Sequence, residues 1–162
     1  MHRIYFYDAP PLDTVKQKPL GGEPLDFGKT SIATTNRRLH HDLQNSPFVA
    51  LRMGIVQFRG WTLKAGLLSQ ATASEVSLGP DDIVPNVQQK GVDMRIGLDI
   101  ASLTLKQHVQ VIVLVTGDSD FIPAMKFARR EGAQLFLVTL GHKVTPEMRE
   151  HSDMILNLAS VS

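Results

Sequence analysis

The chain has 162 residues, enough for one domain with a single hydrophobic core, and 43% of them are hydrophobic. Its 17 basic and 16 acidic residues leave a formal net charge of +1, which excludes a global basic field, so any nucleic-acid binding must use a local patch. The absence of cysteine excludes disulfides and thiolate metal sites and fits a cytoplasmic protein. No apolar run approaches the roughly 20 residues of a membrane span, so we expect no membrane segment.

The first half of the chain predicts few regular elements. In chain order these are a strand over residues 3–7, a loop over 13–30, an amphipathic helix over about 30–44, a strand over 48–58 and an irregular excursion over 61–89. His40 and His41 lie with Arg37 and Arg38 on a basic side of the helix, which either contacts an RNA backbone or is simply solvated. Trp61 either stacks on a base of a single-stranded substrate or packs the excursion.

The second half alternates between helix and strand. The pattern predicts a helix entered at Gly91 and running to about Lys106, a strand over 111–115, a helix over 123–131, a strand over 134–139, a short helix over 146–151 and a strand over 154–158. Such alternation predicts right-handed crossovers and a parallel sheet, so the expected fold class is α/β, with a mostly parallel sheet flanked by helices.

Two carboxylates follow the most apolar run of the chain. The run Val111–Val115 has the composition of a strand covered on both faces, and Asp118 and Asp120 come directly after Gly117. Open α/β sheets hold ligands at the carboxyl ends of their strands. Because two like charges so close repel each other unless a cation lies between them, the pair suggests a divalent metal such as Mg²⁺. In the alternative interpretation, Asp120 caps the following helix and Asp118 makes a turn.

Several spaced motifs occur together in a fixed order. They are Lys90-Gly-Val-Asp93, Leu98-Asp99, Val115-Thr-Gly-Asp-Ser-Asp-Phe-Ile-Pro123, Gly132 and His151-Ser-Asp-Met-Ile155. In this arrangement the chain resembles the NYN domain, specifically its LabA-like branch within the PIN-like nuclease superfamily. The opening Tyr5-Phe-Tyr-Asp-Ala-Pro-Pro11 resembles the second strand of that branch.

The resemblance implies one NYN domain over residues 1–162 with a PIN-like, Rossmann-like three-layer fold. It also implies a metal-dependent ribonuclease that uses Mg²⁺ or Mn²⁺, with Asp93, Asp118 and Asp120 as metal ligands and catalytic residues. The family's first strand ends in an Asp-Gly-x-Asn motif that supplies a further acidic ligand, and this motif is absent from the sequence. We therefore expect a domain that lacks its first strand, with the gap filled by exchange in a homodimer or by an inward shift of residues 3–7.

Polar and basic side chains near the carboxylates are candidates for contacts with the phosphates of a single-stranded RNA. The candidates are Lys90, Arg95, Thr116, Ser119, His142 and Lys143. The two hydroxyls either orient water and phosphate or make turn hydrogen bonds. Lys90 is otherwise a solvated lysine, and Arg95 otherwise pairs with a carboxylate.

Two other functions stay open. One is a non-catalytic module of the same fold that binds RNA or a protein. The other is a phosphatase similar to the haloacid dehalogenases. Their metal-binding motif reads Gly-Asp-Ser followed by a later Asp, and Gly117-Asp-Ser-Asp120 fits it loosely. That family needs an Asp-x-Asp nucleophile pair after an early strand, and Asp8 and Asp13 have the wrong spacing for it.

Overall fold

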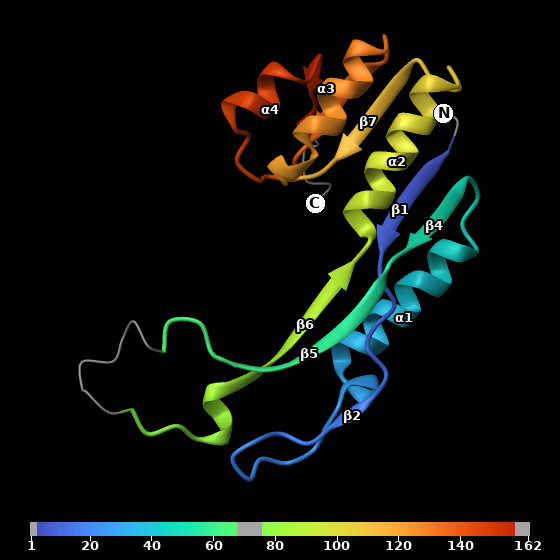
Figure 1. Cartoon of the computed structure of the whole chain (residues 1–162). Coiled ribbons are helices and arrows are strands. Elements are labelled where there is room, and N and C mark those ends of the chain that lie inside the picture. The colour runs from blue at the N-terminus through green and yellow to red at the C-terminus, as the bar shows by residue number, and fades with distance from the viewer. Residues whose placement is uncertain (1–2, 68–75, 158–162) are drawn as a thin grey trace. The chain divides into compact units, whose positions relative to one another are not determined.

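The computed structural model describes residues 3–67 and 76–157 and shows an α/β fold with both parallel and antiparallel strand pairs (Figure 1). The chain divides into two compact units, called here unit 1 (Arg3–Val92) and unit 2 (from Asp93 onward). Each unit is described by itself. Among the described residues, no helix has the length and apolar composition needed to cross a membrane.

Unit 1 is built around a parallel strand pair. Strand β1 (Ile4–Asp8) runs parallel to β4 (Val49–Met53), with Ile4 opposite Val49, and helix α1 (Ser31–Gln44) connects them. The Thr30 side chain caps α1 by accepting a hydrogen bond from the backbone N–H of Ala33. These elements confirm the strand and the helix that the sequence predicts at the start of the chain.

The segment predicted as a loop contains more structure than expected. Strands β2 (Val15–Lys16) and β3 (Leu25–Asp26) pair antiparallel, and a 3₁₀ turn, η1 (Phe27–Lys29), follows them. The chain reverses through Leu20 and Gly21, which both have positive φ, and glycine adopts that conformation at little cost. The Gly- and Pro-rich composition therefore marks the reversal of a short hairpin.

The strand predicted over residues 48–58 is two strands separated by Gly54. Strand β5 (Ile55–Leu63) pairs antiparallel with β6 (Ile83–Lys90), so regular structure extends far into the segment that we expected to be irregular. A Cβ atom at Gly54 would lie 2.6 Å from the carbonyl oxygen of Lys90, so only glycine allows this close approach. The strand β4 therefore ends where the backbone meets the end of β6.

A proline in the second strand of this hairpin is the reason that the sequence pattern did not predict it. Pro85 lies opposite Trp61, directly after the register shift between Phe58 and Trp61. Bulges and edge strands are the places where a strand tolerates proline, which has no N–H to donate. A single 3₁₀ turn, η2 (Pro80–Asp82), precedes β6.

Unit 2 contains the alternating elements that the sequence predicts. They are α2 (Val92–Leu105), β7 (Val111–Val115), the 3₁₀ turn η3 (Ser119–Phe121), α3 (Ile122–Arg130), β8 (Gln134–Val138), α4 (Pro146–Glu150) and β9 (Met154–Ile155). Strands β7, β8 and β9 form a parallel sheet in that order, which confirms the expected parallel pairing. Residue 158 of the last predicted strand lies outside the described residues.

The core of unit 2 is formed by residues of α2, α3 and α4 together with β7 and β8. Met125, Leu135, Leu137 and Met148 are fully buried, and Ile100 of α2 belongs to the same cluster. The prediction that β7 is covered on both faces is wrong for this structure, because Leu114 is buried whereas Val113 is 53% exposed. Because successive side chains of a strand point to opposite faces, this alternation means that one face of β7 is covered and the other, with Val111, Val113 and Val115, is open.

Candidate functional site

The two carboxylates of the Thr-Gly-Asp-Ser-Asp motif lie in an exposed turn that follows β7 and includes the start of η3. In this carboxylate turn (Thr116–Asp120), the Thr116 hydroxyl accepts a hydrogen bond from the N–H of Asp118 at 3.1 Å. The Asp118 carboxylate in turn accepts one from the N–H of Asp120 at 2.9 Å. Asp118 therefore caps η3, which confirms the part of the alternative in which Asp118 makes a turn. The part in which Asp120 caps the following helix is wrong, because α3 begins after Phe121 without a side-chain cap. The Asp120 carboxylate stays exposed at the surface of unit 2.

His142 lies against this turn. A Cβ atom at Gly117 would come within 2.6 Å of both Cβ and Cγ of His142, so the histidine occupies the space that glycine leaves. The connection after β8 folds back at this point, since the N–H of His142 donates to the carbonyl of Thr139. The structure thus places His142 beside the turn, at the sheet edge where the sequence predicts it, and exposes the adjacent Lys143.

Asp93 occupies the first turn of α2 and is exposed. Helix α2 leads directly into β7 and runs antiparallel to it, so the beginning of α2 and the carboxyl end of β7 lie at the same end of unit 2 (Figure 1). Arg95 is exposed one residue beyond Met94 on the same helix. Lys90 is the last residue of β6 and belongs to unit 1.

The carboxylates Asp93, Asp118 and Asp120 form no ion pair within residues 3–67 and 76–157. Carboxylate oxygens are the donor type that Mg²⁺ and Mn²⁺ prefer, so the donor chemistry fits such an ion. The same described residues contain no group of three or more His, Asp or Glu side chains close enough to hold a metal ion. The assignment of the three aspartates as a shared ligand set stays a prediction.

Pattern analysis missed a second polar constellation, which lies in unit 1. Asp8 ends strand β1, and its carboxylate lies 2.8 Å from Nε2 of His40 and accepts hydrogen bonds from Gln89 and from the N–H of Ala9. His40 is buried, so its assignment to a solvated, basic side of α1 is wrong. The available signal was the spacing of seven residues between Ala33 and His40, which places both on one face of the helix, and both are buried.

This constellation also bears on the phosphatase alternative. That reaction would need an aspartate free to act as a nucleophile, but the Asp8 carboxylate is engaged by three neighbours. Asp13 instead lies 3.8 Å from the guanidinium of Arg37. The Asp13 side chain is 80% exposed and this ion pair is solvated, so what speaks against the phosphatase is the engaged Asp8 and the wrong spacing between the two aspartates.

The His-Ser-Asp motif near the C-terminal end serves the fold of unit 2. The Asp153 carboxylate accepts a hydrogen bond from the N–H of Leu135 at 2.7 Å and one from Nε of Arg129 at 3.1 Å. It thereby joins α3 to the start of β8. Asp153 therefore stabilises the fold of unit 2 and is not a candidate metal ligand.

Comparison with known proteins adds one finding. The family model of the NYN domain matches residues 54–158, which is well over half of the chain and includes the carboxylate turn and Asp93. No curated protein and no solved structure matches the chain.

Proposed function

The chain belongs to the NYN domain family, and on that premise we propose that it is a metal-dependent ribonuclease that cleaves single-stranded RNA at the carboxylate turn. NYN domains have the PIN-like nuclease fold. One observation carries the proposal: Asp118 and Asp120 are exposed at the carboxyl end of a parallel strand, without a cation partner in the described residues. Such a place attracts a divalent cation and, through it, a phosphate.

In this proposal Asp118, Asp120 and Asp93 hold Mg²⁺ or Mn²⁺. Mg²⁺ commonly takes one or two protein carboxylates and completes its shell with water and substrate phosphates, so two adjacent aspartates supply a reasonable protein share. When bound, such an ion lowers the pKa of a water molecule and neutralises charge on the phosphate. No side-chain nucleophile is needed.

The neighbouring groups have separate roles in the proposal. Thr116 holds the backbone of the turn, as its hydrogen bond to Asp118 supports, and the Ser119 hydroxyl is left for a phosphate oxygen or water. His142 and Lys143 border the turn and would contact the RNA backbone. Arg95, on the same unit as the turn, would neutralise a further phosphate of the RNA, and Lys90 of unit 1 is a separate candidate for a phosphate contact.

Cleavage of a labelled single-stranded RNA tests the proposal. The chain should cleave in Mn²⁺ or Mg²⁺ and stop when a chelator is added, and Asp118→Asn and Asp93→Ala should each abolish cleavage because each removes a metal ligand. Asp42→Asn is the matched control, since it removes an exposed carboxylate from α1 in unit 1 and should leave cleavage unchanged. Cleavage that persists in chelator, or equal cleavage by Asp118→Asn, would reject metal-dependent cleavage at the carboxylate turn. Absence of cleavage in both metals would leave the non-catalytic binding module.

A further inference from the structure

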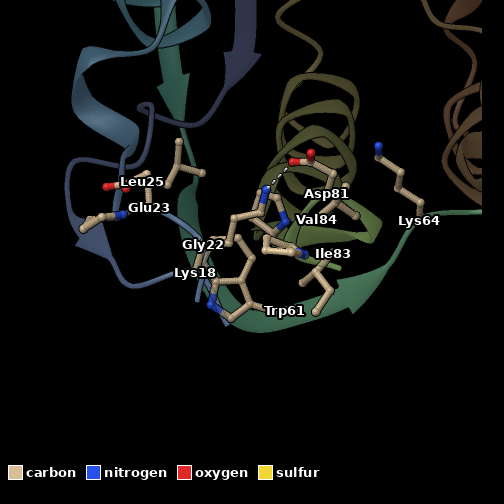
Figure 2. A pocket seen from close by; sticks show the side chains of 12 residues that line it. Lys18, Gly22, Glu23, Leu25, Trp61, Lys64, Asp81, Ile83 and Val84 are labelled. Carbon is tan, nitrogen blue, oxygen red and sulfur yellow. Dashed lines mark hydrogen bonds and ion pairs between the residues drawn. The ribbon is translucent and has the colours of Figure 1, made fainter. Parts of the chain in front are cut away.

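Unit 1 contains a cavity of about 500 Å³ between the β2–β3 connection and the β5–β6 hairpin. Its walls are mostly apolar and include Leu25, Trp61, Ile83 and Pro85. Lys18 also lines it and pairs with Asp81, whereas the Lys64 side chain lies apart from the other labelled residues (Figure 2). The volume falls in the range of cavities that enclose small ligands, about 300 to 1,000 Å³. It lies in a different unit from the carboxylate turn.

The indole of Trp61 is a fixed wall of this cavity. It packs edge-on against the ring of Phe58, with 5.6 Å between centroids, and Phe58 packs in turn against Phe27 at 5.7 Å. Trp61 also sits in the strand ladder opposite Pro85. The aromatic contacts and the strand position hold the ring in place. A ligand that stacks on it therefore loses little binding free energy to the ordering of this side chain.

Lys18 and Lys64 line the same cavity as Trp61. The Lys18 Nζ lies 3.4 Å from a carboxylate oxygen of Asp81, whose side chain is 97% exposed, so this ion pair is solvated and easily exchanged. Lys64 lines the cavity and forms no ion pair with any described residue. Glu23 and Asp81 also line the cavity, so its net charge is balanced and its interior suits a neutral ring with an anionic group at the rim.

We propose that this cavity binds one base of a single-stranded RNA, stacked on Trp61, with an adjoining phosphate contacted by Lys64 and Lys18. A nucleotide combines a flat, neutral ring with a negative charge, and one cavity offers an aromatic wall and two lysines that match them. The inference rests on the proposed function for the identity of the ligand. It adds a binding site for the RNA strand outside the carboxylate turn.

The cavity can be tested directly because Trp61 is the only tryptophan in the sequence. Decauridylate and decaadenylate are titrated into the full chain carrying Asp118→Asn, which prevents cleavage during the measurement. Stacking of a base should quench the tryptophan fluorescence to saturation, and raising the KCl concentration should shift the midpoint to higher RNA concentration. Binding of labelled RNA without quenching would overturn the proposal, as would quenching by a proline-rich decapeptide and not by RNA.

Variants then separate stacking from charge, with binding followed by the anisotropy of labelled decauridylate. Trp61→Leu should weaken binding about tenfold, and Trp61→Phe, which keeps a ring against Phe58, should weaken it less. Lys64→Gln should lower the slope of log K against log[KCl] by about 0.7, whereas the exposed control Lys29→Gln should not. Thermal melts followed by circular dichroism identify a variant whose fold is lost, and an unchanged affinity in folded Trp61→Leu would contradict the proposal.

The two proposals can fail separately. Quenching by RNA together with absent cleavage in Mn²⁺ would reject the nuclease and keep the Trp61 cavity. Cleavage that depends on Asp118 without any quenching would keep the nuclease and reject the cavity.

Discussion

The contact between His40 and Asp8 fastens helix α1 to the end of strand β1. Because both side chains are largely buried, removing the imidazole would leave the Asp8 carboxylate short of a partner. We expect His40→Ala to lower the free energy of unfolding by about 1 to 3 kcal/mol. His41→Ala is the matched control, since His41 is exposed one residue later on the same helix, and should change it by less than about 0.5 kcal/mol. Urea unfolding measures both, and equal effects would contradict the structural role of His40.

Glu147 of α4 carries the one clear electrostatic perturbation among the described residues. A hydrogen bond from Lys126 at 2.8 Å, and then the charge of that ammonium, lower the pKa of the Glu147 carboxyl below its ordinary value of 4.5. A lowered folded-state pKa means that the pair stabilises the fold above pH 4.5, and that this contribution disappears as the pH falls through the folded-state pKa. NMR titration should show this lowered pKa and its return toward 4.5 in Lys126→Gln. A pKa that does not move in the variant would show that the pair does not form in solution.

Asp118 should connect metal binding to stability. An ion that binds only the native state stabilises it by mass action, by about 2.7 kcal/mol when the free ion is 100 times its Kd. Millimolar Mn²⁺ should therefore raise the melting temperature of the natural chain, and the rise should vanish in Asp118→Asn. If both proteins show the same rise, the ion binds elsewhere.

Alanine should change the free energy of unfolding in opposite directions at Gly117 and at Gly97. At Gly117 a methyl group would meet Cβ and the ring of His142, so Gly117→Ala should cost about 1 to 3 kcal/mol of unfolding free energy and shift the NMR signals of His142. At Gly97, within α2, the same methyl group meets nothing within 4 Å, and Gly97→Ala should stabilise by about 0.5 to 1 kcal/mol through helix propensity. Urea unfolding of both variants measures the contrast. A neutral Gly117→Ala would mean that His142 does not rest on the turn.

The elements that sequence predicted well are those whose pattern is local. Short apolar runs marked β7 and β8, and the helical spacing of Ile32, Leu39 and Leu43 marked α1, because these signals depend on residues close together in sequence. The β5–β6 hairpin was missed because its strands are far apart in sequence and one contains Pro85 at a bulge. Only the pairing partner explains why proline is tolerated there.

The candidate site shows the same division. The carboxylate turn and the position of His142 beside it followed from a contiguous motif and from the rule that parallel strands end at one edge. His40 and Asp153 were misjudged or overlooked because their role depends on partners 32 and 18 residues away. A charged residue on a helix gives no local sign that a distant carboxylate or amide will pair with it.

Burial is distributed unevenly over the chain, and local stability should follow it. Within residues 3–67 and 76–157, all of the fully buried large side chains lie in unit 2, on α3, β8 and α4. Because local opening is most costly where apolar burial is greatest, backbone amides of β8, which has a strand on either side, should exchange with deuterium more slowly than those of β1 and β4. Slower exchange in β1 than in β8 would show that the core of unit 2 is not the most stable part of the molecule.

Truncation of a side chain on each face of the β7–β8 strand pair tests whether only one face is packed against the core. Leu137 is fully buried in the cluster of unit 2, so Leu137→Ala should remove about 2 to 5 kcal/mol from the free energy of unfolding, through lost burial and the cavity left behind. Val113 faces away from that cluster and is 53% exposed, so Val113→Ala should cost less than about 1 kcal/mol. Urea unfolding of both variants, at the same protein concentration, measures the two losses of unfolding free energy. A Val113→Ala cost as large as that of Leu137→Ala would mean that the second face of β7 is covered in solution, as its five branched apolar residues first suggested.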